Sequence, residues 1–413
     1  MSSAAVLLSS PACTLRLSFP TTTPFPKLRN DAFRCCKCNN KKKLYIYCAL
    51  PFDLSPPPID LDTSETTTEA EPKFLEDWIT NKFDNDDEAL DAVNNDVAVV
   101  DLSNYGRIRV SGQDRIQFLH NQSTANFECL SEGQGCDTVF VTSTARTIDL
   151  SHAWVMKNAV VLVVSPTTCG SIVEMLKKYI FFADKVEIQD ITNQTRMFSL
   201  LGPKSIEMMK NLNVGNLVGQ PYGSHKHYNI GGMPLTVAVG STISEEGFTL
   251  MMSPSAAGSV WKTLVGQGAV PMGANAWETL RILRGRPAPG KELTDEYNVL
   301  EAGLWRGVSL NKGCYKGQET ISRLVTYDGV KQRLWGLRLS SPVEPGNIIT
   351  FDGNKVGKLT SFTAGRKGSE LFGLGYIKRR VTSEGDSVTV GEGVIGKLVE
   401  LPFLREQLPP PKT

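Results

Sequence analysis

Apolar residues repeat along the chain with two periods, and these predict where helices and strands lie. Within residues 171–182, apolar side chains fall at i, i+3, i+4, i+7 and i+8, which predicts one amphipathic helix. The same period, together with capping residues, predicts helices at residues 74–82, 88–94, 114–120 (capped by Ser111), 203–212, 254–265 and 274–284. Short runs rich in apolar and β-branched residues predict strands at residues 97–102, 107–110, 138–142, 153–156, 159–164, 186–191, 196–201, 235–239 and 248–252.

These strands alternate with single helices, and no long crossover connections follow them. The pattern therefore favours an α+β fold with mostly antiparallel sheets. Lys157-Asn158 predicts a hairpin between two of the strands, and a turn at 103–106 separates another two. From Lys331 onward the helical period disappears, and Gly, Pro and Asn turns predict a small β-barrel or sandwich of about 75 residues. Its strands are expected at residues 333–339, 348–351, 355–362, 372–377 and 387–390.

A chain of 413 residues is too long for one hydrophobic core, so several domains are expected. The shifts in composition predict a leader at 1–50, a Pro-, Thr- and acid-rich linker at 51–72, and a region of two subdomains at 73–328. The barrel follows at 329–403, and a tail at 404–413.

Charge is unevenly spread along the chain. The formal net charge is +1, yet residues 1–50 carry eight Lys or Arg and one acid, Asp31. Subtracting these from the totals of 44 bases and 43 acids leaves 36 bases and 42 acids in residues 51–413. This part of the chain is mildly acidic, which argues against a nucleic-acid-binding protein. The Ser- and Thr-rich, acid-poor leader is typical of a transit peptide and favours the chloroplast stroma. The mitochondrial matrix, or a tail without a targeting role, are the alternatives.

Cysteine usage agrees with a reducing compartment. Five of the nine cysteines lie in the leader, and the remaining four, Cys129, Cys136, Cys169 and Cys314, suggest no disulfide framework. Apolar runs such as residues 159–164 are far shorter than a membrane-spanning helix requires, so no contact with a membrane is expected.

Three stretches imitate known binding motifs weakly. Residues 285–291 match a phosphate-binding loop, but two prolines remove N–H donors and Glu292 stands where Ser or Thr would bind magnesium. His225 and His227 lack a nearby carboxylate or thiol, so an exposed polar turn is favoured over a metal site. Residues 84–88 lack the glycine of a calcium loop. No metal site is predicted.

The least core-like stretch is Lys312-Gly313-Cys314-Tyr315-Lys316-Gly317-Gln318-Glu319. Its two glycines suit a backbone that turns tightly or passes close to a ligand. Its two lysines are placed to lower the pKa of the Cys314 thiol. The alternative is a polar surface loop around one small buried thiol.

This stretch resembles the K-G-C-Y-x-G-Q-E signature of the YgfZ-type folate-binding proteins, relatives of the glycine-cleavage T-protein (aminomethyltransferase). The resemblance extends over roughly residues 85–380. It implies a T-protein-like fold, with two mixed antiparallel-sheet and helix subdomains and a C-terminal barrel around a central folate pocket. It also implies tetrahydrofolate as the cofactor.

The resemblance also implies roles for particular residues. Asp149 matches the catalytic aspartate of a G-G-x-x-D-D segment, and Glu245 matches a glutamate that contacts the pterin ring. Glu301 is a further candidate to bind the pterin, since a carboxylate can accept paired hydrogen bonds from its amino and amide edge. Arg281 is expected either to bind a folate carboxylate or to be a structural charge. Cys314 is the expected reactive thiol, and Lys312 is expected beside it at the folate site.

The chain departs from the T-protein pattern at two informative positions. The second aspartate of the D-D pair is Leu150, and the T-protein has no cysteine where Cys314 stands. Both departures favour a folate-dependent factor for iron–sulfur cluster assembly or repair, acting transiently with assembly or client proteins and as a monomer. A folate-dependent aminomethyl- or methyltransferase and a non-catalytic folate-responsive scaffold are the alternatives.

Overall fold

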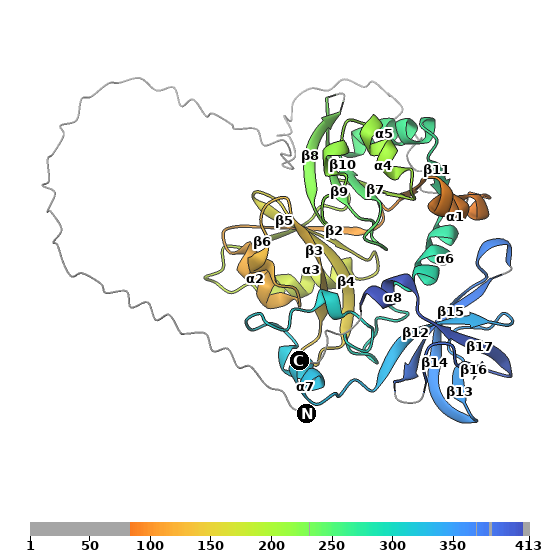
Figure 1. Cartoon of the computed structure of the whole chain (residues 1–413). Coiled ribbons are helices and arrows are strands. Elements are labelled where there is room, and N and C mark those ends of the chain that lie inside the picture. The colour runs from red at the N-terminus through yellow and green to blue at the C-terminus, as the bar shows by residue number, and fades with distance from the viewer. Residues whose placement is uncertain (1–82, 231, 369, 380–381, 408–413) are drawn as a thin grey trace, which may run out of the picture. The chain divides into compact units, whose positions relative to one another are not determined.

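The computed structural model describes residues 83–407 except 231, 369, 380 and 381. All described elements lie within one compact unit of the chain, which contains two open sheets and a closed barrel (Figure 1). The predicted leader and linker, the helix at 74–82 and the last six residues lie outside the described residues.

The first sheet has five antiparallel strands in the order β3-β4-β5-β2-β6. One face is covered by helices α2 and α3, whose Leu119, Ile172 and Leu176 are fully buried against Ile108 and Leu162 of the sheet. The strands are β2 (Gly106–Ser111), β3 (Gly135–Val141), β4 (Thr147–Val155), β5 (Ala159–Val164) and β6 (Glu187–Asp190); the helices are α2 (Arg115–Gln122) and α3 (Cys169–Lys178), with a 3-10 turn η1 (Phe127–Cys129).

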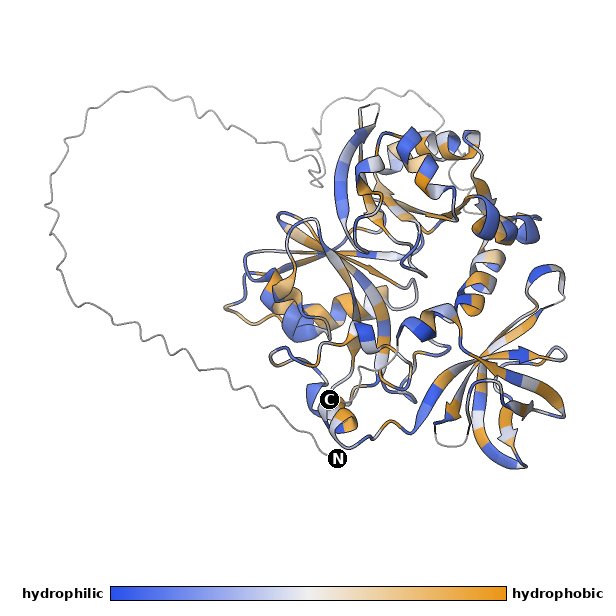
Figure 2. Ribbon diagram, viewed as in Figure 1, coloured by the Kyte–Doolittle hydropathy of each residue, from blue (hydrophilic) through white to orange (hydrophobic). Residues whose placement is uncertain are grey.

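The second sheet has six strands in the order β11-β1-β7-β10-β9-β8, and only the β1–β11 pair is parallel. Its outer face packs on α4 and α5. The strand β8 forms an edge and is largely hydrophilic (Figure 2), which suits a strand whose outer backbone groups are unpaired. The elements are α1 (Asp86–Asn95), β1 (Ala98–Asp101), β7 (Arg196–Leu201), α4 (Ser205–Asn211), η2 (Gly215–Leu217), β8 (His225–Ile230), β9 (Met233–Val239), β10 (Phe248–Met252), α5 (Pro254–Gly266), β11 (Val270–Met272) and α6 (Ala274–Arg284).

The inner faces of the two sheets share one hydrophobic cluster. Trp154, Val161 and Val163 of the first sheet pack with Met197 and Met251 of the second. These residues alternate along their strands with residues of the outer cores, as the two-residue period of a strand requires. Both sheets are therefore largely apolar on the two faces that these clusters cover.

The C-terminal strands close into the predicted barrel, in the order β12-β15-β14-β13-β16-β17. The predicted α+β class, with two sheet-and-helix subdomains and a terminal barrel, is confirmed. The sequence patterns missed β8, β11, β17, α7 and α8. The elements are η3 (Trp305–Gly307), α7 (Gln318–Thr326), β12 (Gln332–Leu339), β13 (Ile348–Phe351), β14 (Asn354–Thr363), η4 (Arg366–Gly368), β15 (Leu371–Lys378), β16 (Ser387–Val390), β17 (Val394–Val399) and α8 (Pro402–Glu406).

Two local expectations were wrong, and one feature of the strand pairing was not predicted. Ser111 is the last residue of β2, and Asp114 occupies the position before α2 without a capping hydrogen bond from its side chain. The strands on either side of residues 103–106 do not pair with each other, because β1 joins the second sheet and β2 the first. His225 and His227 belong to strand β8 rather than to an exposed turn, and His225 is buried. The hairpin at Lys157-Asn158 is confirmed.

Arg281 on α6 connects helix, loop and barrel. All five of its guanidinium N–H groups are used, on Glu278, Glu292, Ser361 and the carbonyl of Arg286. Glu292 is completely buried and also accepts hydrogen bonds from Thr360 and Ser361 of β14. Burial alone would penalise both charges, so their pairing and hydrogen bonds must compensate for the lost solvation.

Replacing Arg281 by Met should lower the free energy of unfolding by about 3–5 kcal/mol, because it leaves the Glu292 carboxylate buried without its partner. Arg323→Met is the matched control, since its ion pair with Glu319 is exposed at both ends and should change stability by less than about 1 kcal/mol. Urea unfolding monitored by tryptophan fluorescence measures both. Equal, small effects would show that the network contributes little to stability.

Candidate functional site

A polar pocket lies where the two sheets and the loop after α6 meet. The empty space within it, part of which is open to solvent, is about 390 Å³. We call it the central pocket, and it is lined by Tyr105, Asp149, Leu150, His152, Val163, Val164, Ser165, Thr242, Ile243, Arg281, Arg286, Pro287, Ala288 and Pro289. Its wall is divided about equally between polar and apolar groups, and several polar side chains converge on it.

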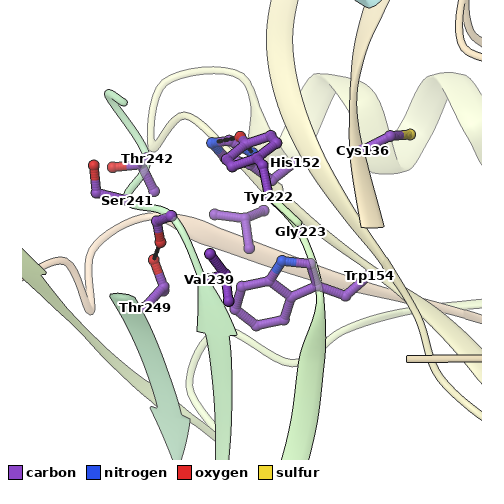
Figure 3. A pocket seen from close by; sticks show the side chains of 11 residues that line it. Cys136, His152, Trp154, Tyr222, Gly223, Val239, Ser241, Thr242 and Thr249 are labelled. Atoms are coloured by element: carbon purple, nitrogen blue, oxygen red, sulfur yellow. Dashed lines mark hydrogen bonds between the residues drawn. The ribbon is translucent and has the colours of Figure 1, made fainter. Parts of the chain in front are cut away.

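A second pocket of about 290 Å³ adjoins the first and shares His152, Val163 and Thr242 with it. We call it the side pocket (Figure 3). Its other lining residues are Cys136, Trp154, Tyr222, Gly223, Val239, Gly240, Ser241 and Thr249. His152 therefore stands in the wall that the two pockets have in common.

Asp149, which the sequence predicts to be a folate-site residue, lines the central pocket. Its carboxylate accepts hydrogen bonds from Ser165 N at 2.7 Å, Ser165 Oγ at 2.9 Å and Thr168 Oγ1 at 2.6 Å. Burial raises the pKa of Asp149, while these hydrogen bonds and the nearby Arg286 act in the opposite direction. The carboxyl is fixed in position, and three of its acceptor sites are already used.

Arg281 and Arg286 line the same pocket but differ in what they can bind. Because all five donors of Arg281 are used within the protein, Arg281 serves as a structural charge. The Arg286 guanidinium lies over the Phe403 ring and 3.9 Å from Asp137. None of the hydrogen bonds among the described residues comes from that guanidinium, so Arg286 keeps donors for a ligand.

A buried acid–histidine–tyrosine cluster forms the wall between the pockets. Asp137 of β3 and His152 of β4 are directly opposite each other in the strand register, with Asp137 Oδ1 2.6 Å from His152 Nδ1. Tyr222, from the loop before β8, donates to Asp137 Oδ1 at 2.7 Å and also contacts the His152 ring. Although burial acts to raise it, the pKa of Asp137 is lowered to about 2 by His152, Arg286 and Tyr222.

Glu245 and Glu301 line neither of these pockets. Glu245 is half-exposed and forms an ion pair with Arg306. Glu301 is buried, and its side chain accepts a hydrogen bond from the backbone N–H of Asn298. Thr242 and Ile243, a few residues before Glu245, do line the central pocket.

Lys312 is buried, and its ammonium group donates hydrogen bonds to the backbone carbonyls of His120, Ser123 and Ala125. Burial lowers its pKa to about 8. Its ammonium group therefore fixes the loop after α2 and lines neither pocket. Lys316 packs over the Tyr179 ring and against Met175.

Buried contacts fix residues 312–319 at several points, and one thiol of this stretch is exposed. Tyr315 is buried in a core cluster, and Gly317 has a positive φ of 84° at the start of α7. A Cβ at Gly317 would lie 2.9 Å from the carbonyl oxygen of Thr142, so glycine is required there. Gly313 has no such contact. Cys314 is exposed and lines neither pocket.

Asp137, Tyr222, Arg286 and the role of His152 were not predicted from the sequence. His152 had no visible partner, because Asp137 is fifteen residues away and becomes its neighbour only through the β3–β4 register. The only available signal was a histidine three residues after Asp149, directly before the strand predicted at 153–156. Among the described residues, no group of three or more His, Cys, Asp or Glu could hold a metal ion. No helix in the described part of the chain is long and apolar enough to cross a membrane.

Two sheets around a polar pocket, followed by a closed barrel, define the fold class of the glycine-cleavage aminomethyltransferases. The crystal structure of glycine cleavage system aminomethyltransferase T from Bartonella henselae superposes with a TM-score of 0.69, covering 77% of this chain and 89% of that one at 18% identity.

Sequence comparison shows the family. Residues 70–312 match the GCVT N-terminal domain, and this chain belongs to the GCVT (T-protein) family. A protein of Arabidopsis thaliana, provisionally named a chloroplastic transferase, is 63% identical over 93% of this chain and 90% of its own length. An aminomethyltransferase of Thermotoga neapolitana is 27% identical over 77% of this chain and 89% of its own length.

The lowered pKa of Asp137 predicts how the stability of the fold changes as the pH falls. The folded-state pKa of about 2 lies below the ordinary value of 3.8, so the ionised carboxylate stabilises the fold above pH 4 and loses that contribution as the pH falls towards 2. Asp137→Asn should therefore be less stable than wild type at pH 6, by about 2 kcal/mol.

Thermal unfolding at pH 6, 5, 4 and 3 measures this difference. We expect the gap in Tm between wild type and Asp137→Asn to narrow as the pH falls. Asp352→Asn, in a barrel turn, is the control. A gap that is constant with pH would contradict the assignment of the stabilisation to the ionised carboxylate.

Proposed function

We propose that the protein is a YgfZ-type, tetrahydrofolate-binding protein of the chloroplast stroma that supports the assembly or repair of iron–sulfur clusters. The observation that carries the proposal is the combination, in one T-protein fold, of a polar pocket containing Asp149 with an exposed Cys314 on a pinned signature loop. The chloroplastic relative at 63% identity supports the location.

The residues of the central pocket fit a reduced pterin. The pterin is a flat ring with N–H donors along one edge and a carbonyl acceptor, and it needs apolar walls with a few polar contacts. Tyr105, Pro287 and Pro289 offer apolar surface, and Asp149, Thr242 and Arg286 offer acceptors and donors. When bound, tetrahydrofolate supplies nitrogens that carry one-carbon units.

Two features favour cluster assembly over transfer from an aminomethyl donor. Leu150 replaces the second acid of the T-protein segment and packs in a core cluster. Cys314 is exposed at the surface, where a protein partner can reach it. A single thiolate cannot hold a cluster that normally takes four cysteine ligands, so Cys314 acts with a partner's ligands or transiently.

A folate-dependent aminomethyl- or methyltransferase is the second candidate. The match to the aminomethyltransferases favours it, together with the fixed carboxyl of Asp149 in the pocket. Under this function Asp149 would stabilise charge near the reactive nitrogens of the folate. Release of ammonia from an aminomethyl donor in the presence of tetrahydrofolate would support this candidate.

Folate binding is tested by calorimetry with tetrahydrofolate. Asp149→Asn should weaken binding by at least about tenfold, because a hydrogen bond to a charged group is lost. Glu245→Ala should change it much less, since Glu245 lies outside the pockets and pairs with Arg306. Absence of binding by the wild-type protein would overturn the proposal, and a larger loss in Glu245→Ala than in Asp149→Asn would show that the pterin lies elsewhere.

The role of Cys314 is tested by complementation. Plastids lacking the protein should regain the activity of iron–sulfur enzymes with the wild-type chain but not with Cys314→Ala, while the Tm of the variant stays unchanged because the side chain is exposed. Cys129→Ala is the matched control, another exposed cysteine. Full rescue by Cys314→Ala would remove the thiol from the mechanism and favour a non-catalytic folate-responsive scaffold.

A further inference from the structure

The strand β4 presents a second polar residue to the pockets, beside the position where the acid is missing. Residues two apart on a strand share a face, so Leu150, His152 and Trp154 point to the same side of β4. Leu150 and His152 both line the central pocket, and His152 and Trp154 both line the side pocket. Of these three residues, His152 is therefore the one whose side chain can gain or lose a proton.

Protein groups cover one edge of the His152 ring. Asp137 Oδ1 lies 2.6 Å from Nδ1, and the Tyr222 oxygen lies 2.5 Å from Nδ1 and 3.3 Å from Nε2. Figure 3 shows the Tyr222 and His152 rings in contact in the wall of the side pocket. An ionised Asp137 can only accept hydrogen bonds. Nδ1 therefore carries the proton that Asp137 accepts, and in the neutral ring Nε2 keeps a lone pair.

The charged and titratable groups around His152 come from each element packed against it. Asp137 is on β3, Tyr222 is in the loop before β8, Arg286 is in the loop after α6 and Asp149 is on β4 itself. Arg286 lies 3.9 Å from Asp137 Oδ2, the carboxylate oxygen other than the Oδ1 that His152 contacts, and it lowers the pKa of that carboxyl. Asp137 thus orients the His152 ring, and Arg286, from another segment of the chain, orients Asp137.

We propose that His152 is a specificity-determining residue of the folate site, whose Nε2 accepts a hydrogen bond from the N5–H of tetrahydrofolate and so selects folate that is unsubstituted at N5. Asp137 positions the ring by fixing its tautomer. This inference rests on the proposed folate-binding function and adds to it the one-carbon state of the ligand.

The reason lies in the ligand's chemistry. Tetrahydrofolate has one hydrogen on N5, whereas 5-methyltetrahydrofolate has a methyl group there and cannot donate. A buried nitrogen with a lone pair loses a hydrogen bond when it faces a methyl group, and a site built to pair with an N–H rejects the analogue that lacks it. The Asp149 carboxyl keeps about one of its four acceptor sites for the ligand, because three are already used within the protein.

The experiment measures the affinities of the full chain for tetrahydrofolate and 5-methyltetrahydrofolate by anaerobic calorimetry. Wild type should prefer tetrahydrofolate, and His152→Leu should lower that preference about three- to tenfold, as expected for one hydrogen bond. Asp137→Asn should lower it as well, because the tautomer is no longer fixed. His227→Leu on β8, outside both pockets, is the control and should keep the wild-type ratio.

A measurement on the wild-type protein keeps the test valid if His152→Leu does not fold. The chain has four histidines, so ¹⁵N-histidine NMR resolves the tautomer of each ring. We expect His152 to carry its proton on Nδ1, and its Nε2 resonance to move on addition of tetrahydrofolate but not of 5-methyltetrahydrofolate.

The outcomes separate the inference from the function on which it rests. An unchanged ratio in His152→Leu, or a proton on Nε2 in the free protein, overturns the role of His152 and leaves folate binding intact. Failure of both folates to bind wild type overturns the proposed function and the inference together.

Discussion

The buried ion pair between Arg281 and Glu292 is the interaction on which the rest of the site depends. It fixes the end of α6, the loop that follows and the barrel strand β14 to one another. That loop carries Arg286 into the central pocket and against Asp137. The sequence left open whether Arg281 binds folate or has a structural role, and these contacts assign it the structural role. Arg286, five residues later, is the arginine whose guanidinium N–H donors remain available.

The pocket is also a consequence of how the two sheets pack. Trp154, Val161 and Val163 of the first sheet meet the second sheet in a shared apolar cluster, and the polar groups collect at the margin of that cluster. Residues from three distant segments, around positions 149–152, 222–242 and 286–289, come together there. Most of the polar contacts are made by the protein to itself, which fixes the geometry before any ligand arrives.

Much of the fold was predictable from the sequence, because hydrophobic period and turn residues are local signals. Strands β7, β10, β13 and β16 and helix α6 begin and end where the pattern predicted. Pairing between distant strands is not a local signal, so the separation of β1 from β2 into different sheets was missed. The same limit applied to the site: Asp149 could be found by its motif, whereas the partners of His152 depend on strand register and on a loop from the other sheet.

The loop around Cys314 has a consequence for the entropy of association. Tyr315 is buried, Lys312 holds three carbonyls and Gly317 fits tightly against Thr142, so the backbone on both sides of the thiol is already ordered. A protein that docks on this loop does not have to immobilise it, and that part of the free-energy cost of binding is avoided. Short-lived complexes can then form with little contact area, as the role proposed for Cys314 requires.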